Sequence, residues 1–220
     1  GFDARVLVAQ RVLVHGFAGE TLRGVLQPSS RPAHLLTDAE RGKPVSLDDL
    51  FIDLGMSADE VRSRVELGDP ITMDRTCERI GKRVISKSLD DRLLVYVMLE
   101  ALRELGSHDC DIYAVATVQE EIGLRGATPA AYAINPDIAI ALDITIAGDI
   151  PGGTPDAQIT QLGAGTAIKI MDASLVCHPK LVRHFRDVAE QHNIKYQLEI
   201  LGRGGTDAGG MQRVRGGIPS

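Results

Sequence analysis

The sequence IYAVATVQEEIGLRGA, at residues 112–127, places an apolar run directly before two adjacent glutamates. Residues 112–118 have the length and composition of a buried strand, and Glu120 and Glu121 follow where that strand would end. Neighbouring side chains of a strand point to opposite faces, so both glutamates reach one cavity only if the strand has ended. Gly123 indicates such a turn. The alternative is a solvated acidic turn without a function.

Two other apolar stretches also lead into acidic residues. Residues 83–89 precede Asp90 and Asp91, and residues 138–142 precede Asp143. Short apolar runs are typical of buried strands in a parallel sheet, and ligand sites of open α/β sheets lie beyond the carboxyl ends of the strands. Carboxylates gathered in one crevice need cations to neutralise them. The pattern therefore favours two divalent metal ions bridged by a carboxylate over ordinary acids at the edges of loops.

The second part of the chain alternates strand and helix patterns, which predicts an α/β fold with a mostly parallel sheet and flanking helices. The apolar spacing predicts a helix over residues 91–105 that is buried on most sides. Shorter or amphipathic helices are expected at residues 128–133 and 179–192, and a strand at residues 196–201. This architecture is predicted for residues 81–220.

Residues 1–80 favour a different, β-rich architecture. Short runs rich in valine and leucine, separated by turn residues, predict a small β-barrel. Ser57 and Glu60 have the spacing of a capping box at the start of a short helix that extends to Val65. The expected strands are residues 5–8, 12–15, 22–26, 48–54 and 71–73.

Composition excludes several classes of protein. The 220 residues are 44% hydrophobic and 25% charged, as in a soluble globular protein, and the net charge of -6 disfavours nucleic-acid and anionic-membrane partners. No stretch approaches the ~20 apolar residues of a membrane helix, and the start lacks the layout of a signal peptide. Cys77, Cys110 and Cys177 are scattered and odd in number, which argues against a disulfide framework and a thiolate zinc site. A cytoplasmic protein is predicted.

Nitrogen ligands and nucleotide sites have weaker support. Residues 204–208 indicate either an anion-binding backbone nest or a plain helix start with Thr206 as its N-cap. Nothing resembles a phosphate-binding loop, so a nucleotide role is not favoured. The six histidines are interpreted as structural, because no carboxylate or second ligand is visibly paired with them; they are His15, His34, His108, His178, His184 and His192.

Four motifs resemble metallopeptidase family 42, the tetrahedral and glutamyl aminopeptidases, some members of which carry the name endoglucanase. The motifs are KSLDDR (87–92), VQEEIGLRGA (118–127), ALDIT (141–145) and GGTDAGGMQ (204–212), in matching order and spacing. The resemblance extends over essentially the whole chain. It implies a zinc-peptidase-like catalytic domain, of which residues 81–220 are a part, interrupted by a smaller PDZ-like β-barrel for oligomerisation at residues 1–80.

The resemblance also implies roles for single residues. It makes the protein a metal-dependent aminopeptidase with two divalent metal ions, zinc or cobalt, in each subunit. It further implies a cis peptide bond between Asp90 and Asp91. The implied roles are bridging metal ligand for Asp90, ligands of one metal each for Glu121 and Asp143, general base for Glu120, support of the bridging ligand for Asp91, and a place near the substrate for Thr206 and Asp207.

One departure from the family pattern concerns histidine. Family members have a His-x-Asp motif before the barrel and a last histidine shortly after the strand matched by residues 217–220, so this sequence is expected to be an interior fragment that lacks both. The expected substrates are peptides, and the expected assembly is a homo-oligomer, a dimer or a dodecamer. The alternatives are another metal-dependent amidohydrolase, such as a deacylase or carboxypeptidase, and a non-catalytic oligomerisation fragment.

Overall fold

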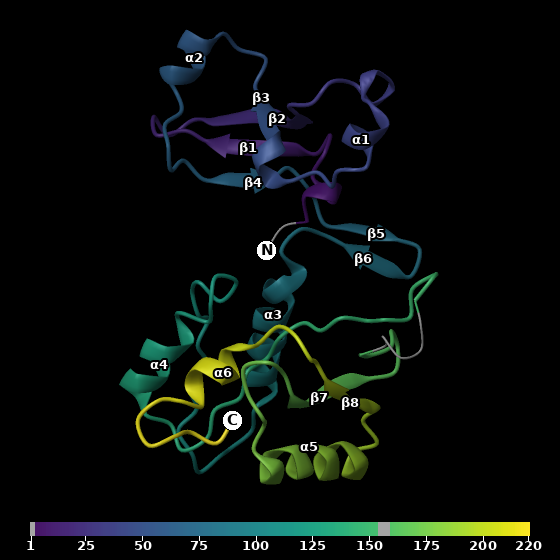
Figure 1. The fold of residues 1–220 in the computed structure, drawn as a ribbon. Helices are drawn as coiled ribbons and strands as arrows, with labels where there is room; N and C mark the ends of the chain where they lie inside the picture. Colours follow the sequence, from purple (N-terminus) through teal and green to yellow (C-terminus); the bar gives the residue numbers. More distant parts are fainter. Residues whose placement is uncertain (1–2, 154–158) are drawn as a thin grey trace. The chain divides into compact units, whose positions relative to one another are not determined.

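The structure, a computed structural model, describes residues 3–153 and 159–220. The chain divides into two compact units, Gly1–Lys87 and Ser88–Ser220, and each unit is described by itself (Figure 1). None of the described helices is long and apolar enough to cross a membrane. The assignment of the two regions to oligomerisation and catalysis stays a prediction.

The first unit is built on a four-stranded sheet with the order β3-β2-β1-β4, in which every pair is antiparallel. Alternation along the strands places Val12 and Val14 of β1 and Leu22 of β2 in the core, as expected for a sheet with one covered face. The strands predicted at these four places are confirmed, whereas the barrel stays a prediction. The strands are β1 (Arg11–His15), β2 (Thr21–Pro28), β3 (Leu50–Asp53) and β4 (Ile71–Met73).

Short helices and a hairpin complete this unit. The capping box of Ser57 and Glu60 is present at the start of α2 (Ala58–Arg62), which ends earlier than predicted. The strand expected at residues 5–8 is wrong, because a 3-10 helix, η1 (Ala4–Val6), begins there with Asp3 as its N-cap. The remaining elements are η2 (Ala33–Leu35), α1 (Asp38–Arg41), η3 (Leu47–Asp49) and the antiparallel hairpin of β5 (Glu78–Ile80) and β6 (Arg83–Ile85).

The described residues of the second unit form four helices and one parallel pair of strands. A small core forms where α4 and α6 lie side by side, from Ala131, Ala139, Val214 and Ile218 (Figure 1). The elements are α3 (Leu89–Glu104), α4 (Ala127–Ile134), β7 (Thr166–Met171), α5 (Pro179–Gln191), β8 (Tyr196–Ile200) and α6 (Asp207–Met211). The helices and the strand predicted at these places are confirmed, and β7 was not predicted.

The prediction of a mostly parallel sheet is not confirmed among the described residues. Among the described strands only β7 and β8 form a parallel ladder, apart from an isolated parallel bridge between Ala147 and Thr160, and residues 113–118 and 138–142 form no ladder with another described strand. Residues 83–85 form β6 and pair within a hairpin instead. The physical reason is that an apolar run becomes a strand of a sheet only where a neighbouring strand satisfies its backbone groups.

Residues 138–146 nevertheless have the alternation of an extended segment. Ile138, Ile140, Leu142, Ile144 and Ile146 are exposed, whereas the residues between them are buried or half-buried. A period of two is the signature of a strand with one covered face, and Asp143 lies on that covered face.

The prediction that α3 is buried on most sides is also wrong. None of its residues is buried, and Leu93, Val97 and Leu99 are among its exposed apolar side chains. Its periodicity is helical as predicted, but the described residues cover only part of its surface. Asp90 and Asp91 have non-helical dihedral angles, so the regular helix begins after them.

Candidate metal and catalytic site

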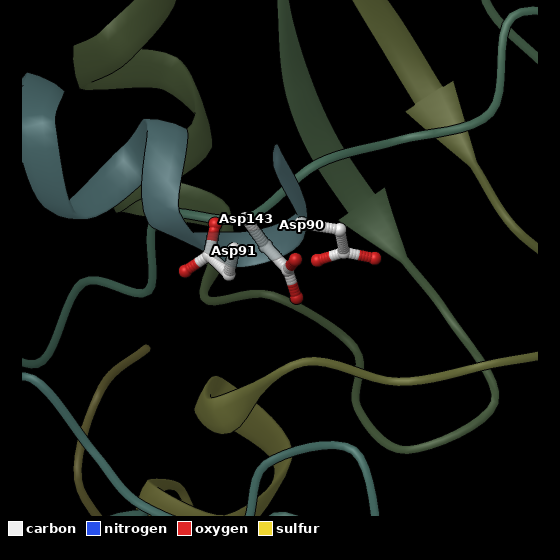
Figure 2. A group of neighbouring side chains, drawn as sticks. All are labelled: Asp90, Asp91 and Asp143. Atoms are coloured by element: carbon white, nitrogen blue, oxygen red, sulfur yellow. The ribbon is translucent and has the colours of Figure 1, made fainter. Parts of the chain in front are cut away.

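Three aspartates meet where α3 begins. Asp90, Asp91 and Asp143 each offer a carboxylate oxygen, and these oxygens all lie within 4.8 Å of one another. Figure 2 shows the three side chains as neighbours, with Asp143 between the other two. The peptide bond between Asp90 and Asp91 is cis, which confirms that expectation. Residues that are far apart in the sequence therefore form one compact acidic group.

Burial and mutual repulsion raise the pKa values in this group. Desolvation and the charges of Asp143, Asp90 and Asp207 raise the pKa of Asp91 to about 6. Desolvation also raises the pKa of Asp143 to about 6, and the neighbouring Asp90 adds to that rise, although a hydrogen bond from the Ile144 N–H acts in the opposite direction. The charge of Lys169 also lowers the pKa of Asp143, but it does not offset the rise that burial causes.

A tight turn presents Glu120 and Glu121. The Leu124 N–H donates to the Glu120 carbonyl at 2.8 Å, and the Gly126 N–H donates to the Val118 carbonyl at 2.9 Å. Gly123 has a φ of 122°, a conformation that favours glycine. The predicted turn after residue 118 is confirmed, and both glutamates line the same pocket.

Glu120 lines this pocket and also interacts electrostatically with the clustered aspartates. Desolvation raises its pKa to about 7, with further contributions from Asp143, Asp207, Glu121 and Asp90. Glu121 is exposed and is not one of the three clustered aspartates. The sequence prediction that Asp90, Glu121 and Asp143 converge thus has support for the two aspartates, and the role of Glu121 as a ligand stays a prediction.

Asp207 extends the acidic group from the other side. It stands at the start of α6, where Thr206 is the buried N-cap residue. Its Oδ2 accepts a hydrogen bond from the Thr117 hydroxyl, and its charge contributes to the raised pKa values of Glu120, Asp91 and Asp143. The motif around Thr206 and Asp207 therefore borders the same site as Glu120.

The arrangement fits a bound cation. The Oδ1 atoms of Asp91 and Asp207 are buried, and neither has a hydrogen-bond partner among the described residues. Clustered carboxylates with raised pKa values are stabilised by a positive ion, and oxygen ligands suit divalent metals. No histidine belongs to the three-residue group found within the described parts of the chain.

The family model of M42 glutamyl aminopeptidases matches residues 1–220. The chain belongs to this M42 family. It is 36% identical to the lysyl aminopeptidase of Pyrococcus furiosus over 225 residues, which cover 99% of this chain and 62% of that relative. The chain spans 54–62% of the length of three curated relatives that it matches.

Two solved structures show the same M42 fold. The TET aminopeptidase of the marine sediment archaeon Thaumarchaeota archaeon SCGC AB-539-E09 superimposes with a TM-score of 0.92 at 37% identity, over 100% of this chain and 62% of that one. The TET1 peptidase of Pyrococcus horikoshii, which can assemble into a tetrahedron or a large octahedral shell, has a TM-score of 0.77 at 29% identity. That match covers 98% of this chain and 64% of the other.

Sequence reasoning missed a buried group behind the pocket of this M42 chain. Lys169 of β7 lies 2.6 Å from a carboxylate oxygen of Glu199 on β8 and 3.6 Å from Asp172. Asp172 in turn holds Ser174, which lines the pocket. The available signal was the presence of Lys169 and Glu199 inside two otherwise apolar runs.

Proposed function

We propose that the protein to which this chain belongs is a metal-dependent aminopeptidase that removes N-terminal residues from peptides. The observation that carries the proposal is Glu120, a half-buried carboxylate with a pKa near 7 between the clustered aspartates and an open pocket. A general base works best when its pKa lies near the working pH. The family and its aminopeptidase members support this assignment.

Asp90 and Asp143 would hold the metal ions, with Asp90 as the ligand common to both and Glu121 as a further ligand of one. Zinc or cobalt, two ions in each subunit, is the proposed cofactor. When bound, such ions polarise the scissile carbonyl and favour ionisation of the attacking water. Asp91 supports Asp90 from the neighbouring position, since the two carboxylates belong to the same compact group.

Glu120 moves the proton in this scheme. One of its Oε atoms accepts a proton from the attacking water, and the same atom later donates that proton to the nitrogen of the leaving amine. Partial burial keeps the carboxyl group close to its point of half-ionisation at neutral pH, so it can accept and return a proton in one cycle. Thr206 and Asp207 border the side of the site where the peptide would bind.

Two matched substitutions in the full-length protein test the separate roles of the glutamates. Glu120→Gln keeps the size of the side chain but cannot accept a proton, so kcat should fall by roughly 10²–10⁴-fold while the metal content stays unchanged. Glu121→Gln should instead lower the metal content measured by elemental analysis. Near-normal turnover of Glu120→Gln, or loss of metal in that variant, would mean that the roles are wrongly assigned.

A substrate panel separates aminopeptidase activity from the activity of a deacylase. Free aminoacyl anilides and their N-acetylated counterparts differ only in the α-amine. The full-length protein should hydrolyse the free compounds and leave the blocked ones intact. Preference for the blocked compounds would overturn the aminopeptidase assignment in favour of a deacylase.

We further propose that the first unit is a PDZ-like domain through which the protein forms a homo-oligomer, a dimer or a dodecamer. Its antiparallel sheet and the assemblies formed by the TET1 peptidase of Pyrococcus horikoshii support this proposal. Mass measurement of the full-length protein by light scattering, with and without residues 1–87, tests it. If the particle contains the same number of subunits after that deletion, the proposal is contradicted.

A further inference from the structure

A tight turn at residues 172–175 packs against the start of α6. Its side chains have no part in the proposed chemistry, yet they contact the segment that carries Asp207. We propose that Asp172 and Ser174 are positioning residues, which fix the start of α6 relative to the turn that carries Glu120. This inference rests on the proposed aminopeptidase function and adds two residues on which its rate depends.

Asp172 closes this turn from inside. Its Oδ1 accepts hydrogen bonds from the Ser174 N–H and hydroxyl, both at 2.7 Å, and from the Leu175 N–H at 3.1 Å. The side chain of Asp172 is 0% exposed, and the Lys169 ammonium group lies 3.6 Å from its Oδ2. Moving the Ser174 hydroxyl away would take a donor from a buried carboxylate, which is unfavourable. The Ser174 side chain is therefore held in one orientation.

Ser174 presents its side chain to the backbone at two glycines. A Cβ added to Gly205 would lie 2.8 Å from the Ser174 hydroxyl and 2.9 Å from its Cβ. A Cβ added to Gly209, in α6, would lie 2.6 Å from the same Cβ and would overlap the hydroxyl. Only glycine allows so close an approach, and the two glycines lie on either side of Asp207 in the chain. The contact therefore fixes the place of the segment between them.

The turn that carries Glu120 contacts the same segment. A Cβ added to Gly210 would lie 3.3 Å from the Leu124 carbonyl oxygen, and the Leu124 N–H donates to the Glu120 carbonyl at 2.8 Å. The Thr117 hydroxyl donates to Oδ2 of Asp207. The start of α6 thus lies against both turns, so a displacement at the other turn shifts Asp207 relative to Glu120. A shift of about 1 Å in a catalytic arrangement can lower a rate by roughly 10²-fold.

An exchange of size between two positions tests this contact. Gly209→Ala places a methyl group where the Ser174 side chain lies, so α6 must move. Adding Ser174→Gly removes that side chain, and of the three atoms nearest to the new methyl group only the carbonyl oxygen of residue 174 remains, at 3.3 Å. Gly202→Ala is the matched control, because an added Cβ there meets nothing within 4 Å among the described residues beyond its chain neighbours.

The measurements use the full-length, metal-loaded protein and the free aminoacyl anilide that the wild type hydrolyses fastest. Gly209→Ala should lower kcat by about 10–100-fold and change KM by less than about threefold, because alignment is lost rather than binding. The double variant should recover kcat to within about fivefold of the wild type, since the overlap is gone. Gly202→Ala should keep kcat within about twofold of the wild type.

Ser174→Ala gives a second test, which decides the matter if Gly209→Ala does not fold. It keeps the Cβ that packs on α6 but removes the hydroxyl that Asp172 holds. We expect kcat to fall by about three- to tenfold at an unchanged KM. Ser63→Ala removes an exposed hydroxyl that donates to the Glu60 carbonyl, and as the control it should leave kcat within about twofold of the wild type.

Metal content and thermal unfolding of each variant show whether the rate is lost for another reason. Normal kcat in folded Gly209→Ala and in Ser174→Ala would overturn the inference while leaving the aminopeptidase assignment intact. So would a loss of kcat in Gly209→Ala that Ser174→Gly does not repair, or one that only follows a loss of metal or of folded protein. If the wild type hydrolyses no free aminoacyl anilide, the proposed function and the inference are overturned together.

Discussion

The Thr117 hydroxyl donates a hydrogen bond to Oδ2 of Asp207, a residue that lies 90 positions later in the chain. This bond joins the segment that leads into Glu120 to the start of α6. The other oxygen of Asp207 is buried and has no hydrogen-bond partner among the described residues. Thr117→Val leaves both oxygens unsatisfied, so we expect the free energy of unfolding in urea to fall by about 1–3 kcal/mol.

Thr145 offers a matched control for this loss. Its hydroxyl is buried but has no hydrogen-bond partner among the described residues. Thr145→Val replaces an unsatisfied group by a methyl group, so stability should stay the same or rise. Equal destabilisation by both substitutions would show that the change of shape, rather than the bond to Asp207, is responsible.

Removal of the Lys169 ammonium group between β7 and β8 should lower the free energy of unfolding by more than Thr117→Val does. Lys169→Met leaves Glu199 and Asp172 as buried carboxylates without a positive partner, and the loss of one member of a buried ion pair typically costs about 3–5 kcal/mol. Urea unfolding of the variant measures this loss. If Glu199→Leu in the same chain restores part of the stability, the unpaired charge is its cause.

The exposed pair of Arg62 and Asp59 gives the contrasting case. These residues lie 3.0 Å apart, but their side chains are 74% and 97% exposed. Because solvent screens such a pair, Arg62→Met should change the free energy of unfolding by no more than about 0.5 kcal/mol. A loss as large as that of Lys169→Met would contradict the role given to burial.

The raised pKa values predict how the stability of the metal-free protein depends on pH. Asp91 and Asp143 titrate near 6 and Glu120 near 7, above their ordinary values of 3.8 and 4.5. Between the ordinary and the raised pKa values, the folded chain therefore holds more protons than the unfolded chain. The contribution of these three groups to stability falls as the pH rises through that range. Thermal unfolding in the presence of a chelator should show this decline, and Asp143→Asn should reduce it.

Added divalent metal should act in the opposite sense. A cation that binds the ionised carboxylates replaces the protons, so it should raise the unfolding temperature more at neutral pH than in mild acid. A decline with pH that is identical in the wild type and in Asp143→Asn, with or without metal, would contradict the assignment of these groups.

The 220-residue chain expressed by itself should bind zinc weakly and show negligible peptidase activity. The group of described residues that could hold a metal ion consists of Asp90, Asp91 and Asp143, and carboxylate ligands alone favour harder ions. Titration calorimetry with zinc and manganese, and elemental analysis, would measure this preference. Stoichiometric zinc would instead indicate a nitrogen ligand; His178 is one candidate, because its buried Nδ1 has no hydrogen-bond partner among the described residues.

Local signals in the sequence predicted local structure well. The capping box of Ser57 and Glu60 and the periodicity of α5 both led to helices at the expected places. Pairing between strands depends on residues distant in sequence, so the composition of residues 138–142 could not show that they pair with no strand among the described residues. Lys169 and Glu199 concealed β7 and its pairing, because charged residues are rarely buried unless they are paired.

The acidic residues of the site could be predicted from the sequence. Asp90, Glu121 and Asp143 were expected to converge; the carboxylate oxygens of Asp90 and Asp143 do so together with Asp91, and the place of Glu121 stays a prediction. The contribution of Thr117 was not predictable, because a single threonine in an apolar run has no distinguishing pattern. The same holds for Ser174, whose position depends on the hydrogen bonds that its N–H and hydroxyl donate to Asp172.

The alternating exposure of residues 138–146 has a consequence for self-association. Five isoleucine and leucine side chains along one face of an extended segment form a surface that favours pairing with a like segment of another chain. Asp143 stands in the middle of this run. Because a charge at that place opposes the stacking of identical strands, we expect the Asp143 carboxylate to limit aggregation as well. Replacing Asp143 by a neutral residue should therefore leave the nascent chain more prone to aggregate, before any peptide or metal has been bound.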